Sequence, residues 1–459
     1  MPRDTTDPRA GHHTPDSPDP ATAGPAVLPA PPPERPGPPD PSGPAAPRGY
    51  RAVFAVREFR AVFAAHLLSL LGVVVSELAL TVLVYDLTSS PLLSALTFAL
   101  GMLPYLVGGT LLGGVADRFP ARRVLVTCDL VCAVCVAVMV LPGTPVAGLL
   151  LLRCLVAAVS PVFTGTRMAA LTDILGEGEL FVLGRSLLRI VSQGSLLAGF
   201  GVGGVLLTVL TPRGAITITV GTFLCSAALL RLGTRDRPAR AREGGGGLLG
   251  ESLSGARLVL GHRRLRALLL LFWLPPLFVV APEAVAAPYA DEIGVGPAAL
   301  GLLMCAMPVG HIASELYAGT ALRPRTRERI VLPLAAAGLL PLAAYALTPG
   351  VAVAAVALVV TGASSAYVIG LDQWFVAEVP EELRGRAMTL LTAGLMTIQG
   401  VGMALTGLAA EFFPVHLVVA GAAVLGTLCL LALVAEVRRT APGPGTEVRD
   451  GEDRQVPHG

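Results

Sequence analysis

Apolar residues run along the chain in long blocks that are separated by short polar segments. Twelve of these blocks are long enough to cross about 30 Å of hydrocarbon as α-helices. We predict helices at residues 58–86, 91–114, 122–141, 146–169, 181–210, 214–232, 264–289, 297–321, 329–347, 351–375, 386–410 and 415–436. Lipid cannot satisfy unpaired backbone groups, and a membrane β-barrel would show short alternating strands instead. The pattern therefore predicts an all-α membrane protein.

The composition of the 459 residues agrees with a chain that lies in lipid. Hydrophobic residues make up 53% of the sequence and charged residues 14%, against about 25% charged residues in an average soluble domain. Long segments hold no Asp, Glu, Lys or Arg: Leu87–Ala116, Leu130–Leu152, Ile190–Pro212, Ile330–Leu371, Ala387–Ala410 and Phe412–Ala435. A soluble fold cannot bury so many uncharged segments. The composition excludes a soluble enzyme and a nucleic-acid-binding protein.

The longest polar segment between predicted helices, 233–263, divides them into two groups of six. The groups span 58–232 and 264–436, which are 175 and 173 residues long. Equal halves indicate an internal duplication, and so two pseudo-symmetric six-helix bundles. We expect a disordered, Pro-rich tail at 1–54, bundles at 55–232 and 264–436, a linker at 233–263 and a second disordered tail at 437–459.

Arginines mark one side of the predicted membrane region. They lie in alternate loops, at Arg118, Arg122, Arg123, Arg235, Arg237, Arg240, Arg242, Arg263, Arg264, Arg266, Arg323, Arg325, Arg327, Arg329, Arg384, Arg386, Arg438 and Arg439. The opposite loops hold a single arginine, Arg213, and the acidic residues Asp291, Glu292 and Glu411. Because basic loops stay inside, we predict a multi-pass protein of the cell membrane, with both termini in the cytoplasm.

All 34 basic residues are Arg, and there is no Lys. A chain without Lys cannot form the Gly-rich, Lys-containing loop that binds ATP phosphates, so it carries no ATP-binding cassette. None of the seven Cys has metal-ligand spacing with His. We therefore expect no metal, no cofactor and no catalytic residues, and the chain is not predicted to be an enzyme.

The loop after the second predicted helix holds a dense group of glycines and charges: Gly113, Gly114, Asp117, Arg118, Arg122 and Arg123. It resembles the signature loop of the major facilitator superfamily, Gly-x-x-x-Asp-Arg-x-x-x-Arg-Arg. The wider pattern is similar to the bacterial siderophore and macrolide exporters of that family, through Ser69–Gly72, Asp129 and Leu383–Arg386. The resemblance implies a twelve-helix transporter that works by alternating access.

The same loop has a physical reading of its own. Gly113 and Gly114 allow helices to approach closely, and Asp117 can cap a helix and pair with a neighbouring Arg. Such a cluster can act as a conformational latch. The alternative is a solvated basic loop that only sets the topology.

Ionisable residues within the predicted helices cost roughly 2.5–3.5 kcal/mol each, so they indicate sites. They are Glu77, Arg153, Glu283, His311, Glu315 and Asp372. Glu77 and Arg153 both lie toward the outer side of the first bundle, and we expect an ion pair that a proton or substrate can break. A fixed structural pair is the alternative. Members of the family that the chain resembles often carry this acid at the position of Val73, one helical turn before Glu77.

His311 and Glu315 are spaced i, i+4 and therefore share a helix face. They can relay protons or bind a cation, or they are a packing contact and an exposed acid. Glu283 follows three prolines that break its helix and suggest a gating hinge. The alternative is a residue near the outer end that is simply exposed to water. Asp372 fits an interfacial anchor. Gln193, Phe200 and Gln399 are expected to line a cavity.

These observations predict a secondary transporter that acts as a monomer. We expect proton-coupled efflux of a lipophilic or amphipathic small molecule, such as a drug, an antibiotic or a siderophore-like metabolite. Efflux, rather than uptake, is what the family resemblance implies. The alternatives are an importer or facilitator of a metabolite without proton antiport, and a membrane-embedded protein that transports nothing.

Overall fold

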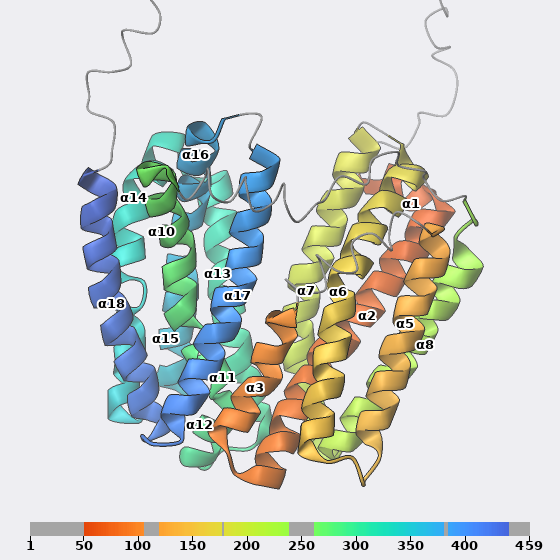
Figure 1. Ribbon diagram of the computed structural model, residues 1–459, viewed down its shortest axis with the longest axis horizontal. Coiled ribbons are helices and arrows are strands. Elements are labelled where there is room, and N and C mark those ends of the chain that lie inside the picture. The colour runs from red at the N-terminus through yellow and green to blue at the C-terminus, as the bar shows by residue number, and fades with distance from the viewer. Residues whose placement is uncertain (1–49, 105–118, 177–178, 238–260, 381–383, 440–459) are drawn as a thin grey trace, which may run out of the picture. The chain divides into compact units, whose positions relative to one another are not determined.

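The computed structural model describes residues 50–104, 119–176, 179–237, 261–380 and 384–439. Every regular element in these segments is a helix (Figure 1). Most of the predicted tails and of the linker, together with 105–118 of the second predicted helix and its loop, lie outside the described residues. α1, Tyr50–Ala55, begins at the end of the predicted N-terminal tail.

The first half contains α1 to α8. After α1, its helices are α2 (Arg57–Thr88), α3 (Pro91–Met102), α5 (Ala121–Val140), α6 (Val146–Leu175), α7 (Glu179–Val209) and α8 (Pro212–Gly233). Local sequence explains where two of them start. Ser90 and Thr211 accept a hydrogen bond from the amide three residues on, and a proline follows each as the first helical residue. Proline lacks the amide that would be unpaired there.

The second half contains α10 to α18, with more interruptions. Its helices are α10 (Arg263–Val279), α11 (Ala281–Ala284), α12 (Ala286–Glu292), α13 (Pro297–Thr320), α14 (Pro324–Ala337), the 3₁₀ helix η1 (Leu340–Leu347), α15 (Val351–Ser364), α16 (Tyr367–Glu378), α17 (Arg384–Ala410) and α18 (Val415–Arg439). The seventh predicted helix is thus broken twice, the ninth ends in a tighter helix, and the tenth is broken after Ser364.

The two halves repeat the same packing. The first helix of each half contacts the sixth, as α2 does α8 and α10 does α18. The first also contacts the fifth, in the pairs α2–α7 and α10–α17. Between the halves the second helix of one meets the fifth of the other, reciprocally, in the pairs α3–α17 and α13–α7. The predicted all-α fold of two pseudo-symmetric six-helix bundles is therefore confirmed.

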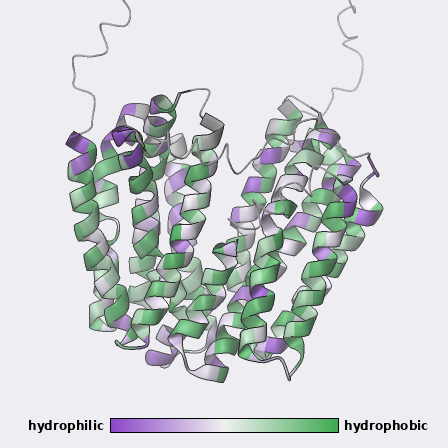
Figure 2. Ribbon diagram, in the orientation of Figure 1, coloured by the Kyte–Doolittle hydropathy of each residue, from purple (hydrophilic) through white to green (hydrophobic). Residues whose placement is uncertain are grey.

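Eleven helical segments among the described residues are long and apolar enough to cross a membrane. α3 is the twelfth member of the repeat and is shorter over its described part. Figure 2 shows hydrophobic residues along the lengths of the helices and hydrophilic ones gathered toward their ends. Large apolar side chains such as Val134 (64% exposed) and Val205 (63%) stay uncovered. Lipid is the medium that suits such an exterior.

Glycines let the halves approach closely near one end of the helices, where α7 and α17 end and α3 and α13 begin. A Cβ added to Gly204 of α7 would lie 2.6 Å from the Cα of Gly301 on α13. In the reciprocal pair, a Cβ on Gly407 of α17 would lie 2.6 Å from the Cβ of Ala95 on α3. Small residues are what allow two membrane helices to cross at contact distance.

Candidate functional site

A buried ion pair joins α2 to α6. Arg153 of α6 is 8% exposed, and its Nη2 atom contacts Oε1 of Glu77 on α2. Its Nε atom donates to the backbone oxygen of Thr97 on α3 at 3.2 Å. A guanidinium cannot be discharged, so inside a bundle it needs such acceptors. The structure therefore brings Glu77 and Arg153 together and ties both to α3.

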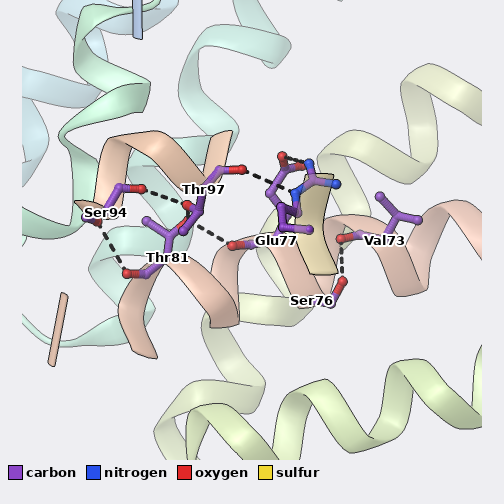
Figure 3. A network of polar contacts seen from close by, with 7 residues as sticks. Val73, Ser76, Glu77, Thr81, Ser94 and Thr97 are labelled. Carbon is purple, nitrogen blue, oxygen red and sulfur yellow. Dashed lines mark hydrogen bonds and ion pairs between the residues drawn. The ribbon is translucent and has the colours of Figure 1, made fainter. Parts of the chain in front are cut away.

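Hydroxyl groups beside this pair make contacts within and between α2 and α3 (Figure 3), and the hydroxyls of Thr81 and Thr97 lie 2.5 Å apart across the two helices. Thr81 donates to the backbone oxygen of Glu77 at 2.8 Å, and Ser94 donates to that of Thr81 at 3.3 Å. Thr97 donates to the backbone of Ser94 at 2.7 Å. Because these hydroxyls find acceptors on the backbone, they are satisfied without water. These hydrogen bonds therefore stabilise the packing of α2 on α3 beside the Glu77–Arg153 pair.

A cavity of about 400 Å³ lies between the two halves. Its walls are largely apolar and include Phe200, Phe272, Pro275, Pro276, Met304 and Met307. The polar groups that face it include Gln193, Glu283, His311, Glu315, Tyr367 and Gln399. This size, and this mixture of apolar walls with a few polar groups, are typical of small-molecule sites.

The cavity gathers most of the residues that the sequence singled out in the second half. His311 and Glu315 lie on one face of α13, with His311 Nε2 and Glu315 Oε1 3.2 Å apart. Gln193 of α7 and Gln399 of α17 line the same space from the two halves, as does Phe200. Asp372, in contrast, is exposed on α16 and does not line the cavity.

Glu283 occupies the break in the seventh transmembrane segment. It lies in α11, a helix of four residues between the interruptions at Val280 and Val285. Pro282 and Pro288 follow the two interruptions and lack the backbone donors that would bridge them, which explains the loss of regular helix. α11 packs against α3 and α17, so both halves contact it. The carboxylate faces the cavity and is half-buried, rather than placed at an exposed outer end.

Polar contacts join the halves at one end of the helices, which carries the turns at 89–90, 293–296 and 411–414. We call it the Glu411 end. Glu411 accepts hydrogen bonds from the hydroxyl of Ser90 and, at 3.0 Å, from the amide of Leu92. Tyr85 donates to Asp291 at 3.2 Å. These contacts hold the two halves together at this end.

The predicted latch falls only partly within the structure. Gly113, Gly114, Asp117 and Arg118 lie outside the described residues. Arg122 and Arg123 open α5, and Arg123 pairs with Asp236 after α8 at 3.5 Å.

Two buried charged groups of the first half were not among the site residues predicted from the sequence, although one of them, Asp129, contributes to the family resemblance. Arg167 of α6 is 8% exposed; its guanidinium lies 4.2 Å from the centre of the Phe163 ring and 3.5 Å from Nε2 of His66. Asp129 of α5 is 1% exposed and accepts from Ser69 and Ser226. The available signal was the spacing of Arg167 from Arg153, four helical turns along one face.

Comparison with known proteins gives relatives over most of the chain. The enterobactin exporter EntS of Shigella boydii serotype 4 (strain Sb227) is 26% identical over 405 residues, which cover 84% of this chain and 94% of that protein. Among solved structures, the nucleoside transporter NupG superposes with a TM-score of 0.63 at 16% identity, covering 81% of this chain and 98% of that one. A bacterial homologue of the iron transporter ferroportin, in an inward-facing state, gives 0.61 at 15%, with 83% and 99% covered.

At 16% and 15% sequence identity, the two solved structures show only that this chain has the same fold as they do. The family model described as "Major Facilitator Superfamily" matches residues 62–371, well over half of the chain. The match agrees with the duplicated six-helix bundles and with the loop that resembles the family signature. The chain therefore belongs to the Major Facilitator Superfamily and is a multi-pass membrane transporter of that type.

Proposed function

We propose that the chain exports a lipophilic or amphipathic small molecule across the cell membrane and couples this export to protons. The observation that carries the proposal is the largely apolar cavity between two halves that are joined at the Glu411 end, together with the buried Glu77–Arg153 pair of the first half. The relative named as an enterobactin exporter supports the outward direction. A drug, an antibiotic or a siderophore-like metabolite fits the chemistry of the walls.

The Glu77–Arg153 pair is the proposed coupling element. When a proton neutralises Glu77, Arg153 loses its counter-ion while it still contacts the backbone of α3 at Thr97. The energy of the α2–α3–α6 contact then changes, which biases the protein between its two states. His311 and Glu315 are a second candidate relay, because they form a contact of 3.2 Å on the cavity wall.

The arrangement of arginines gives the proposal its direction in the membrane. The Arg-rich loops lie at the end where the described chain begins and ends, opposite the Glu411 end. If that end is cytoplasmic, as the positive-inside rule requires, the closed Glu411 end faces outward. Under the same proposal Asp117 and its neighbouring arginines latch the cytoplasmic side. The groups invoked all come from one chain, so a monomer suffices.

A transport screen tests the function. The full chain is expressed in a strain that lacks its own drug exporters, and the accumulation of fluorescent amphipathic compounds is measured with and without a protonophore. We expect lowered accumulation of at least one compound, restored by the protonophore and by Glu77→Gln. Accumulation driven into right-side-out vesicles would instead establish an importer. Export that is unchanged by the protonophore would contradict the proposed coupling to protons.

A further inference from the structure

The carboxylate of Glu283 is the unpaired charge of the cavity. Glu77 contacts Arg153, and Glu315 contacts His311. Glu283 has no ion-pair or hydrogen-bond partner among the residues that the structure describes, although it faces the cavity from α11. A carboxylate removed from bulk water is costly unless a cation or a proton compensates it. The site is therefore incomplete without such a partner.

The surroundings of Glu283 favour a cation with a single positive charge. α11 packs against α3, and Arg153, which contacts Glu77, donates a hydrogen bond to the backbone of that same helix. These three residues together carry one net negative charge when both acids are ionised. One added positive charge therefore balances the group.

The walls of the cavity favour a bulky organic cation over a metal ion or a small amine. Phe200, Phe272, Met304 and Met307 offer aromatic faces and polarisable sulfur instead of the several oxygen ligands that a metal ion needs. Aromatic faces attract organic cations, and a cation whose charge is spread over a large apolar body loses little hydration on entry. The volume of about 400 Å³ is within the range of small-molecule sites.

We infer that Glu283 is the counter-ion that selects lipophilic organic cations as cargo. The inference rests on the proposed export function and names its substrate class. It also assigns a role to the break in the seventh transmembrane segment, where Glu283 lies. Because α11 contacts α3 and α17, a cation bound to Glu283 acts on the segment where the two halves meet. Occupancy of the cavity is then communicated directly to the contact between the halves.

The test compares three probes of similar shape and different charge: tetraphenylphosphonium (positive), triphenylphosphine oxide (neutral) and tetraphenylborate (negative). Their dissociation constants are measured by calorimetry on the purified full chain in nanodiscs. We expect the phosphonium to bind the wild type about tenfold more tightly than the neutral probe. Glu283→Gln should abolish this ratio while leaving the affinity for the neutral probe nearly unchanged. Glu283→Asp should keep part of it, which guards against misfolding.

Glu315→Gln is the matched control. It also removes a negative charge from the cavity, but this charge is already in contact with His311. A loss of selectivity in Glu315→Gln equal to that in Glu283→Gln would overturn the inference, since the charge of the whole cavity would then suffice. Failure of the wild type to prefer the phosphonium would overturn it as well. Protonophore-sensitive export of a neutral or anionic compound by Glu283→Gln would leave the proposed function standing. If the wild type exported no compound of any charge, the proposed function itself would fail.

Discussion

The carboxylate of Glu411 accepts a hydrogen bond from the backbone amide of Leu92 at 3.0 Å, and a second from the hydroxyl of Ser90. Glu411 lies between α17 and α18 in the second half, whereas Ser90 and Leu92 open α3 in the first. The first amides of a helix lack partners within it, so a carboxylate there is favourable. One half thus caps a helix of the other, and the cap can exist only while the Glu411 end is closed.

Glu411→Ala should therefore shift the protein toward a state that is open at the Glu411 end. Loss of a charge-assisted contact of about 1.5–2 kcal/mol raises the ratio of open to closed molecules roughly 10- to 30-fold. Spin labels on Leu87→Cys and Phe412→Cys, after replacement of the native cysteines, report the distance between the halves; both side chains are exposed. We expect a new population at longer distance. Glu436→Gln is the control, because its partner Arg263 belongs to the same half; equal shifts in both variants would contradict the cap.

Glu77→Ala should destabilise the first half by about 3 kcal/mol, because it leaves the guanidinium of Arg153 buried without its counter-ion. Glu77→Gln should cost less, since its amide oxygen still accepts a hydrogen bond, yet it should lose flux driven by a pH gradient. Unfolding in detergent and flux in proteoliposomes measure the two effects. The double variant Glu77→Ala, Arg153→Leu should recover much of the stability. Full gradient-driven flux in Glu77→Gln would exclude Glu77 as the coupling residue.

Gly204→Leu should force α7 and α13 apart, since even a Cβ at Gly204 meets the backbone of Gly301. We expect a lower melting temperature, equivalent to about 1–3 kcal/mol, and loss of transport. Gly194→Ala is a matched control on the same helix, because nothing lies within 4 Å of a Cβ placed there. That change should be neutral or stabilise by up to about 1 kcal/mol, through helix propensity. An unchanged melting temperature in Gly204→Leu would show that the halves do not cross in this way.

Asp129→Ala should destabilise the first bundle by about 1–3 kcal/mol, because the buried hydroxyls of Ser69 and Ser226 lose their charged acceptor and keep only neutral ones. Asp129→Asn keeps an acceptor oxygen and should cost less. Denaturant titration of the purified protein gives the order. Asp236→Ala serves as the exposed reference, since its ion pair with Arg123 lies at the surface and contributes at most about 1 kcal/mol. If Asp129→Ala lowered the free energy of unfolding no more than Asp236→Ala does, the buried network would not contribute to stability.

The positions of the helices were largely predictable from the sequence, because bilayer thickness fixes the length of an apolar block and polar turns separate the blocks. The internal breaks were not. Around Val280, Val285 and Ser365 nearly all residues are apolar, so hydropathy carries no signal. Pro276 and Pro282 indicated an interruption, but two halves packing on α11 decide where it falls.

The site was predictable as a set of residues but not as an arrangement. Glu77 and Arg153 could be paired from the sequence because both interrupt apolar helices at similar depth. The setting of Glu283 depends on tertiary contacts with α3 and α17, which no local pattern encodes. Arg167 was missed because the groups in contact with it are an aromatic ring and His66, while the acid that acts on it, Asp129, lies on another helix.

The glycine crossing of α7 and α13 has a mechanical consequence. Gly204 and Gly301 bring two backbones into contact without interlocking side chains, so this contact resists rotation less than a leucine-packed crossing would. It can serve as an axle that stays assembled while the helices tilt. Because the crossing lies near the Glu411 end, such a tilt displaces the opposite ends of the helices furthest. The two halves can then change their angle without separating at this contact.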